Sequence, residues 1–235
     1  MLKRVFFFCR PFSDLGWPET NSLTAGLRSE LTDIVHSTNI DLAERLATEG
    51  SLSVSFFETD ECPTNGTALK PGVNRIVQPS DPFDVRVFAA VKEAFDEDES
   101  SHVAIFLGVN PLYPAALVKA GMDLLDQEDD VVAIGEGTSV HDAPPLWVGM
   151  KRFHQRLLAE LVRRSPTQPG AYLNSIEECI VVPMSRQPHV RSINDLAWLL
   201  HEVEREILLN RWYPKRTFDS LQRMKQAGSL KEVLL

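Results

Sequence analysis

The chain has 235 residues, 43% of them hydrophobic, and a formal net charge of −9. This apolar fraction is enough for a packed core, and the acidic balance argues against a nucleic-acid-binding protein, which would carry a basic face. No stretch approaches the ~20 apolar residues of a membrane span, so we expect no membrane partner. The three cysteines, Cys9, Cys62 and Cys179, form no CxxC pair. Their spacing predicts reduced thiols in a cytoplasmic protein, without a zinc site or a disulfide framework.

The first fifty residues predict one strand and one long helix. Residues 4–9 predict a strand, because the five residues after Arg4 are all apolar, which is typical of a strand covered on both faces. A loop with two prolines follows. Apolar residues at helical spacing from Leu27 to Leu46 then predict a helix, with a break near Asn39 and a stop at Gly50.

Two strands and a second helix are predicted before residue 100. The strands cover residues 52–58 and 75–78, separated by a polar, irregular stretch. Asp81 as the N-cap and Pro82 as the first helical residue predict where the helix begins. The acidic run at residues 96–99 closes this helix, and we interpret it as a solvated turn and not as a cation site.

Residues 102–150 are the centre of the predicted fold, in the order strand, loop, helix, strand, loop, strand. The apolar runs of this stretch are 102–108, 130–136 and 145–150, and the helical pattern extends to about residue 126. In open α/β sheets, ligands bind just beyond the carboxyl ends of strands. We therefore expect a site at the loop that follows Gly108.

The last third of the chain predicts two helices around one strand, followed by a basic tail. A helix over 151–164 and a strand over 178–184 precede Ser192, which with Asp195 resembles a capping box. This alternation predicts one α/β domain over residues 1–210 with a mainly parallel sheet. We expect residues 211–235 to be a helical extension that packs on its own subunit or a neighbouring one, as in a homodimer.

Few side chains carry recognisable chemistry, since Walker, GxGxxG, HExxH and GxSxG motifs are absent. The histidines at 36, 154 and 201 fall on helical segments, where structural roles are the default. Cys9 ends the first strand, but no neighbouring base is evident, which favours an inert buried thiol. Trp147 is either a core aromatic or a stacking platform, and Arg10 is either a phosphate ligand or a surface cation.

Several segments have the order and character of motifs in a known family. A first strand leads into a basic, proline-containing loop, and a central strand ends ahead of a helix. The segments are Phe8–Pro11, Leu107–Pro111 with Leu112–Pro114, Val131–Gly135, Leu146–Lys151 and His189–Leu196. In this layout the chain resembles the nucleotide-diphospho-sugar transferases of the glycosyltransferase-A fold, over about residues 5–200. More narrowly, it resembles an uncharacterised bacterial branch related to the molybdenum-cofactor and lactyl-phosphate guanylyltransferases.

The chain departs from this family where a divalent ion is held. The family has an aspartate after the central strand and another before the last helix, and the ion bridges the phosphates of the nucleotide. Alignment puts Val109 or Asn110 at the first place, and His189 and Arg191 at the second. Because magnesium prefers carboxylate oxygens, the resemblance implies that the metal site is lost. The family's lysine-threonine-arginine run is also missing, with Leu27-Arg28 its nearest remnant.

The resemblance implies a three-layer α/β/α sandwich with a mainly parallel mixed sheet. It also implies a nucleotide or nucleotide-sugar site with weak or no metal-dependent transfer. The alternative is an interaction or regulatory module on the same fold, and no catalytic residue is assigned. The residues expected to line the site are Phe8, Cys9, Arg10, Pro11, Gly108, Val109, Asn110, Trp147, His189 and Arg191.

Loss of the acids suggests how phosphate binding would work without a metal. Arg191 could meet a diphosphate directly, because guanidinium pairs with phosphate oxygens in a bidentate fork. A protonated His189 would add to the same positive field. The opposing interpretation is that Arg191 points to solvent and the pocket binds nothing.

Overall fold

The computed structural model describes residues 2–10, 17, 23–49, 52–60, 68–98, 101–127, 130–138, 145–163 and 179–228. Within these ranges strands and helices are interspersed along the chain, in the order that the sequence predicts. The strands are β1 (Lys3–Phe8), β2 (Ser53–Glu58), β3 (Val73–Val77), β4 (His102–Phe106), β5 (Val131–Thr138), β6 (Trp147–Met150) and β7 (Ile180–Pro188). The helices are α1 (Ala25–Glu49), α2 (Phe83–Glu97), α3 (Ala115–Leu124), α4 (Gln155–Arg163), α5 (Ile193–Leu208) and α6 (Lys215–Gln226).

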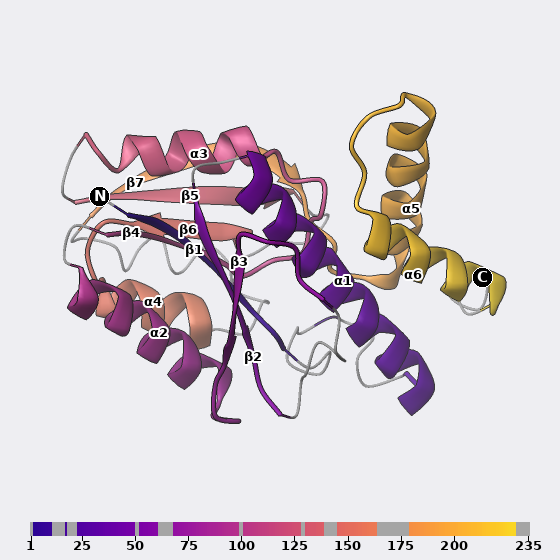
Figure 1. Ribbon diagram of the computed structural model, residues 1–235, viewed down its shortest axis with the longest axis horizontal. Coiled ribbons are helices and arrows are strands. Elements are labelled where there is room, and N and C mark those ends of the chain that lie inside the picture. The colour runs from indigo at the N-terminus through magenta and orange to yellow at the C-terminus, as the bar shows by residue number, and fades with distance from the viewer. Residues whose placement is uncertain are drawn as a thin grey trace.

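The seven strands form one mixed sheet in the order β3-β2-β1-β4-β6-β5-β7. β6 runs antiparallel to β4 and β5, and the other pairs are parallel. Helices α1 and α3 cover one face, and α2 and α4 cover the other (Figure 1). The predicted three-layer α/β/α architecture with a mainly parallel mixed sheet is therefore confirmed.

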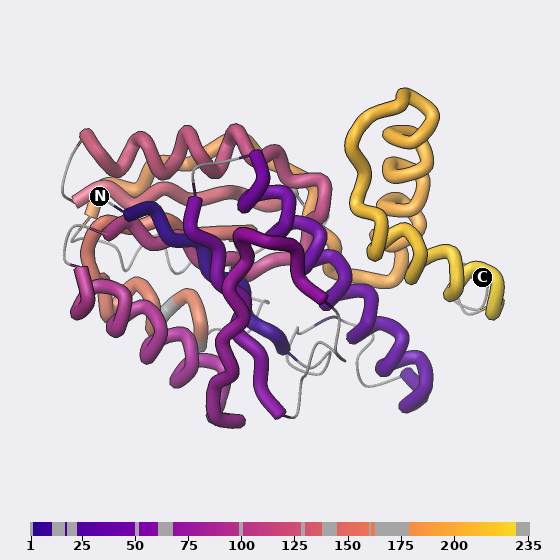
Figure 2. The backbone as a smooth tube through the Cα atoms, in the orientation of Figure 1, coloured from indigo at the N-terminus to yellow at the C-terminus, as the bar shows by residue number. Residues whose placement is uncertain are grey.

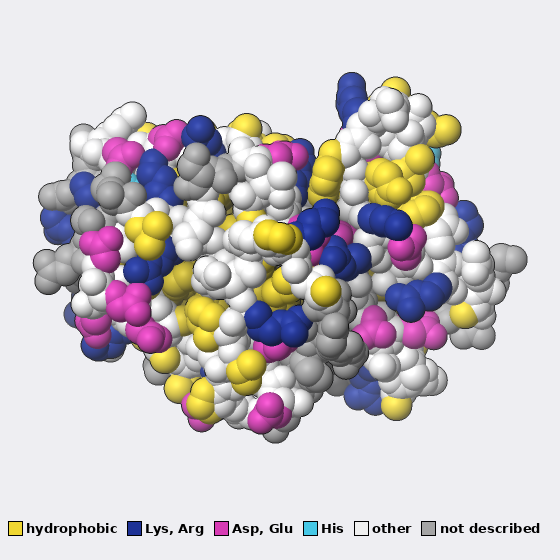
Figure 3. All heavy atoms as spheres, in the orientation of Figure 1, with side chains coloured by type: hydrophobic (Ala, Val, Ile, Leu, Met, Phe, Trp, Pro, Cys, Tyr) yellow, Lys and Arg dark blue, Asp and Glu magenta, His cyan; other side chains and the backbone are white. Residues whose placement is uncertain are grey.

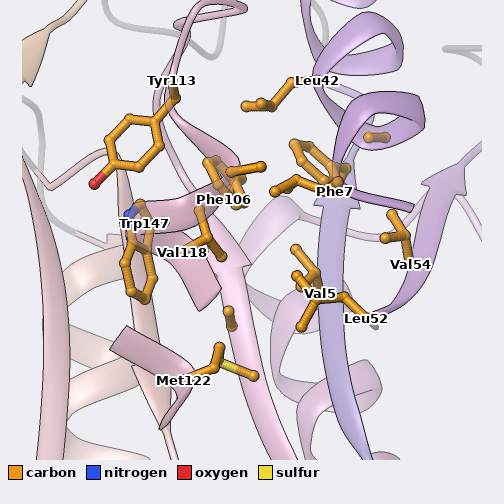
Figure 4. Packing of buried hydrophobic residues seen from close by; sticks show 14 of the residues in the cluster. Val5, Phe7, Leu42, Leu52, Val54, Phe106, Tyr113, Val118, Met122 and Trp147 are labelled. Carbon is orange, nitrogen blue, oxygen red and sulfur yellow. The ribbon is translucent and has the colours of Figure 1, made fainter. Parts of the chain in front are cut away.

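Strand β1 shows why its sequence is apolar at every position from Val5 to Phe8. Successive side chains of a strand point to opposite faces of the sheet. Val5 and Phe7 pack under α1 and α3 with Trp147 and Tyr113, as Figure 4 shows, whereas Phe6 and Phe8 pack under α2 and α4. Both faces of this strand are thus buried, and both need apolar side chains.

Helix α1 is longer and more regular than the sequence predicts. The predicted break near Asn39 is wrong, because the helix continues through that residue to Glu49. Its neighbours Thr38 and Ile40 are buried, and the Thr38 hydroxyl donates to the carbonyl oxygen of Ile34 at 2.8 Å. Packing on both sides of Asn39 therefore overrides the low helix propensity of this stretch.

Two predicted helix starts had different outcomes. Helix α2 begins one residue later than predicted, with Pro82 as N-cap and no side-chain cap, so the assignment of Asp81 as N-cap is wrong. Helix α5 begins as predicted, because the Ser192 hydroxyl accepts a hydrogen bond from the backbone N–H of Asp195. The Asp195 carboxylate in turn accepts from the backbone N–H of Arg191 at 2.8 Å.

Helices α5 and α6 lie beyond the sheet, at the opposite end of the molecule from the N-terminus (Figure 2). They pack against the first half of α1 in a third hydrophobic cluster that includes Leu31, Leu196 and Leu221. Asp41 of α1 caps α6: its Oδ2 accepts from the backbone N–H of Thr217 at 2.8 Å and from the Thr217 hydroxyl at 2.9 Å. The extension thus packs on its own subunit up to residue 228. No helix among the described segments is both long and apolar enough to cross a membrane.

Candidate phosphate site at the strand ends

Residues that follow three strands of the sheet meet at one edge. Arg10, just beyond β1, donates a hydrogen bond from its guanidinium to the carbonyl oxygen of Leu107, just beyond β4. The backbone N–H of Val190, beyond β7, donates to the carbonyl oxygen of Val109 at 2.9 Å. The structure therefore brings together segments that the sequence separates by about 80 to 180 residues, at the edge where the site is predicted.

The loop after β4 is fixed by the side chain of Asn110. Its Nδ2 donates to the carbonyl oxygen of Pro188 at 2.7 Å, and its Oδ1 accepts from the backbone N–H of Leu112 at 2.9 Å. Asn110 is 3% exposed. Both polar atoms of this side chain therefore serve the fold.

His189 occupies a narrow space between two glycines. A Cβ atom added to Gly108 would lie 2.7 Å from His189 Nε2, and one added to Gly137 would lie 3.0 Å from His189 Nδ1. Only glycine leaves room for the imidazole at Gly108, because a contact under 3.0 Å would force a shift. His189 is consequently buried, and its Nδ1 atom has no hydrogen-bond partner among the residues that the structure describes.

The environment of His189 decides its charge. Burial, followed by the nearby cations Arg191 and Arg10, lowers the pKa of His189 from 6.5 to about 3. The imidazole is therefore neutral at neutral pH and does not supply the positive charge that a protonated His189 would add. The cause is burial in a space that the sequence alone does not reveal.

The positive charge at this edge comes from arginines. The guanidinium of Arg10 lies 4.3 Å from the ring centre of Phe83, a cation–π contact. Arg86, at the start of α2 and 5% exposed, donates to the carbonyl oxygen of Cys9 at 2.9 Å. Arg191 is partly buried, which lowers the pKa of its guanidinium, while Asp195 opposes this shift. Arginine nevertheless stays charged in proteins.

Phe83 and Arg86 were not found by sequence reasoning. They lie on the first turn of α2. The predicted helix start near Asp81 indicated where this turn is in the sequence, but not that it lies beside Arg10. Arg86 holds the backbone just before Arg10, and Phe83 lies against the Arg10 guanidinium. These two residues therefore position Arg10.

The residues at the family's metal position do not fit a divalent ion. Val109 is 3% exposed and belongs to the cluster that α5 and α6 form with α1. Asn110 uses its oxygen on a backbone N–H, and Arg191 is a cation. Among the described residues, no three His, Cys, Asp or Glu side chains are grouped so that they could hold a metal.

Three other predicted lining residues are buried in the core. Phe8 stacks on Phe57 with 4.7 Å between ring centres. Trp147 has no exposed surface and lies against Gly135 and Gly121, which matches the alternative of a core aromatic. Cys9 is also fully buried, and Pro11 lies outside the described residues.

The prediction that all three cysteines are reduced is wrong for Cys9, which is disulfide-bonded. Its partner lies outside the described residues, since Cys179 is free. The Sγ atom of Cys9 also lies 2.9 Å from Nε2 of His36. The wide spacing of cysteines in the sequence gives no indication of which ones the fold brings together.

Comparisons with known proteins give the fold a context. No family model matches the chain, and no curated protein matches its sequence. Among solved structures, the chain is similar to a protein from Desulfovibrio desulfuricans G20 described as a nucleotide-diphospho-sugar transferase. The TM-score is 0.69, with 15% identity over 99% of both chains.

A second similar structure is the 2-C-methyl-D-erythritol 4-phosphate cytidylyltransferase of Francisella tularensis. Its TM-score is 0.50 with 10% identity, over 84% of this chain and 98% of the other. Similarities at these identities establish the architecture alone. The chain therefore has the nucleotide-diphospho-sugar transferase fold.

Proposed function

We propose that the chain binds the phosphate groups of a nucleotide or nucleotide-sugar through Arg10 and Arg191, without a divalent ion. Any metal-dependent transfer is weak or absent. The observation that supports this proposal is that the guanidinium groups of Arg10 and Arg191 both lie near the neutral imidazole of His189. Both guanidinium groups lie near enough to His189 to lower its pKa, and all three residues follow strands that end at the same edge.

The local structure favours an anion at this edge. Arg10 is held by the Leu107 carbonyl and by the ring of Phe83, so less side-chain freedom is lost when a ligand binds. Guanidinium groups recognise phosphate in a bidentate fork. Burial raises the strength of such contacts, because the local dielectric is lower than that of water.

Catalysis by a bridging metal receives no support from these residues. A divalent ion in such a site would polarise the phosphoryl oxygens and balance their charge, and it would need carboxylate ligands. Val109, Asn110 and Arg191 supply none. Two arginines can balance part of the phosphate charge, but they cannot hold a metal ion that would activate a water molecule.

A non-catalytic interaction module is the second candidate. It is favoured by the burial of Val109 against the cluster that holds α5 and α6, because the family's metal position then serves the packing of the C-terminal helices. This candidate predicts that the chain binds no nucleotide at all.

Binding of GDP, CDP and UDP, followed by isothermal titration calorimetry, separates the two candidates. We expect Arg191→Ala to weaken nucleotide binding at least ~10-fold, since a hydrogen bond to a charged group contributes about 1.5–3 kcal/mol. Arg152→Ala is the matched control, because Arg152 pairs with Asp130 next to the opposite end of β5. If the wild-type chain binds none of the three nucleotides, the interaction module is the better account. Nucleotide binding that Arg191→Ala leaves unchanged would contradict the role proposed for Arg191.

A further inference from the structure

A cavity of about 420 Å³ lies where the body of the protein meets α5 and the turn that leads to α6. This volume is within the range of small-molecule sites, about 300–1,000 Å³. Figure 3 shows Lys and Arg side chains gathered beside hydrophobic ones where these two parts meet. The residues that give the cavity its chemical character are Arg45, Gln187, Trp198, Arg205, Arg211 and Trp212.

Two tryptophans provide flat apolar walls. Trp198 projects from α5, and Trp212 stands just before α6 with 36% of its surface exposed. The guanidinium of Arg45 lies 4.3 Å from the ring centre of Trp212, and Glu49 holds that guanidinium at 3.0 and 3.1 Å. The indole is thus fixed in place by Arg45. Two tryptophans beside an open cavity suit a planar, apolar ring.

Among the charged side chains that line the cavity, Arg205 and Arg211 are more exposed to solvent than the glutamates. The side chains of Arg205 and Arg211 are 54% and 64% exposed, whereas Glu202 and Glu206, also in the lining, are 17% and 18% exposed. With Arg45, the lining holds three arginines against two glutamates. Glu49, which pairs with Arg45, lies outside the lining, so each of the three arginines has a glutamate nearby and they differ in how closely that glutamate engages them.

Arg211 is the cation best placed to meet a ligand. Its Nη1 is 3.8 Å from the nearest Glu206 oxygen, which is too far for a hydrogen bond. Arg205, in contrast, is engaged by Glu202 at 2.8 Å. The guanidinium of Arg211 therefore retains donors for one anionic group, and the side-chain amide of Gln187 offers a further polar contact.

We propose that this cavity binds a small molecule that combines one planar aromatic ring with one anionic group. The rings of Trp198 and Trp212 receive the aromatic part, and Arg211 receives the carboxylate or phosphate. One arginine with available donors fits a single anionic group better than a diphosphate. The cavity is distinct from the phosphate site, because Arg10 and Arg191 do not line it, although Asn110 and Pro188 form part of the wall between the two.

Calorimetric titration with 1-naphthoate tests this proposal, with 1-naphthalenemethanol as its neutral analogue and 1-naphthyl phosphate as its phosphate analogue. We expect saturable binding of 1-naphthoate and at least tenfold weaker binding of the alcohol. A preference between the carboxylate and the phosphate then identifies which anion the cavity takes.

Variants assign the binding to this cavity. Arg211→Ala is expected to weaken 1-naphthoate binding at least fivefold, and Trp212→Ala to weaken it further. Arg211 is exposed, so its variant should keep the wild-type melting temperature even if Trp212→Ala loosens the packing of α6. Arg191→Ala and Arg152→Ala serve as controls and should bind 1-naphthoate as the wild type does.

Three results would overturn the proposal. The first is the absence of saturable binding up to millimolar 1-naphthoate. The second is equal affinity for the acid and the alcohol, and the third is unchanged affinity in Arg211→Ala. Loss of 1-naphthoate binding in Arg191→Ala would instead move the ligand to the phosphate site and contradict a separate cavity.

Discussion

The side-chain amide of Asn110 joins the loop after β4 to the last residue of β7: its Nδ2 donates to the carbonyl oxygen of Pro188 at 2.7 Å. The same side chain accepts a hydrogen bond from the backbone N–H of Leu112 at 2.9 Å. Asn110 is one of the two residues, with Val109, at which the resemblance to the nucleotide-diphospho-sugar transferases places a metal-holding acid. In this chain the position serves to hold two strand ends together.

The first prediction concerns this junction. Asn110→Asp keeps the acceptor for Leu112 but places a carboxylate against the Pro188 carbonyl oxygen. We expect a loss of about 1–3 kcal/mol in the free energy of unfolding, measured by urea denaturation. The control is Asn74→Asp on the exposed strand β3. If millimolar magnesium restored the stability of Asn110→Asp, the residue would be a latent metal ligand and the interpretation as a structural junction would fail.

The second prediction concerns the pH dependence of stability. The folded-state pKa of His189, about 3, lies below the ordinary value of 6.5. The unfolded chain therefore binds the proton more strongly, so stability is lost as pH falls from about 6.5 towards 3. Between pH 7 and pH 5 this one residue should cost about 2 kcal/mol.

Denaturation at several pH values, with variants, checks the contribution of His189. His189→Phe keeps a ring of similar size without a titrating group and should flatten the decline below pH 6.5. His201→Gln, on an exposed position of α5, should decline as the wild type does. An unchanged slope in His189→Phe would show that His189 is not the residue responsible.

The third prediction concerns the space around Trp147. A Cβ atom on Gly135 would lie 2.0 Å from Nε1 of Trp147, whose side chain is fully buried. Gly135→Ala should therefore cost about 1–3 kcal/mol or more, the usual penalty for overpacking a core. Gly26→Ala in α1 meets nothing within 4 Å and should be neutral or slightly stabilising. Equal melting temperatures for the two variants would contradict the packing described here.

The fourth prediction concerns the C-terminal helices. Asp41→Ala removes the acceptor for the backbone N–H and hydroxyl of Thr217 and should destabilise the protein by about 1–2 kcal/mol, as loss of a helix cap does. Asp219→Ala, at an exposed position of α6, is the control. If both variants unfold at the same urea concentration, the α1–α6 junction contributes little to stability.

Apolar patterns predicted the order of elements well. From Val5 to Phe8, β1 is buried on both faces and has no polar residue that would obscure it. The capping residues Ser192 and Asp195 marked the start of α5. Patterns failed where long-range packing outweighs local preference. The continuity of α1 through Asn39 depends on burial of its neighbours, and the disulfide of Cys9 is not indicated by the spacing of the cysteines.

The candidate site was predicted only in part, for the same reason. The strand-end rule located Arg10 and Gly108 at one edge, and the family resemblance added His189. It could not show that Trp147 faces the core, nor that Arg86 reaches the backbone beside Arg10 from another helix. The charge of His189 was also beyond the sequence, because it depends on the burial and the cations that the fold creates.

The central claim is that phosphate binding at Arg10 and Arg191 needs no metal. The most direct test is titration of the full chain with GDP, CDP and UDP in excess EDTA and again in millimolar magnesium or manganese. We predict the same affinity in both conditions for the nucleotide that binds, and weaker binding as salt is added, since exposed charge interactions are screened. Binding that appears only with magnesium or manganese would contradict the claim.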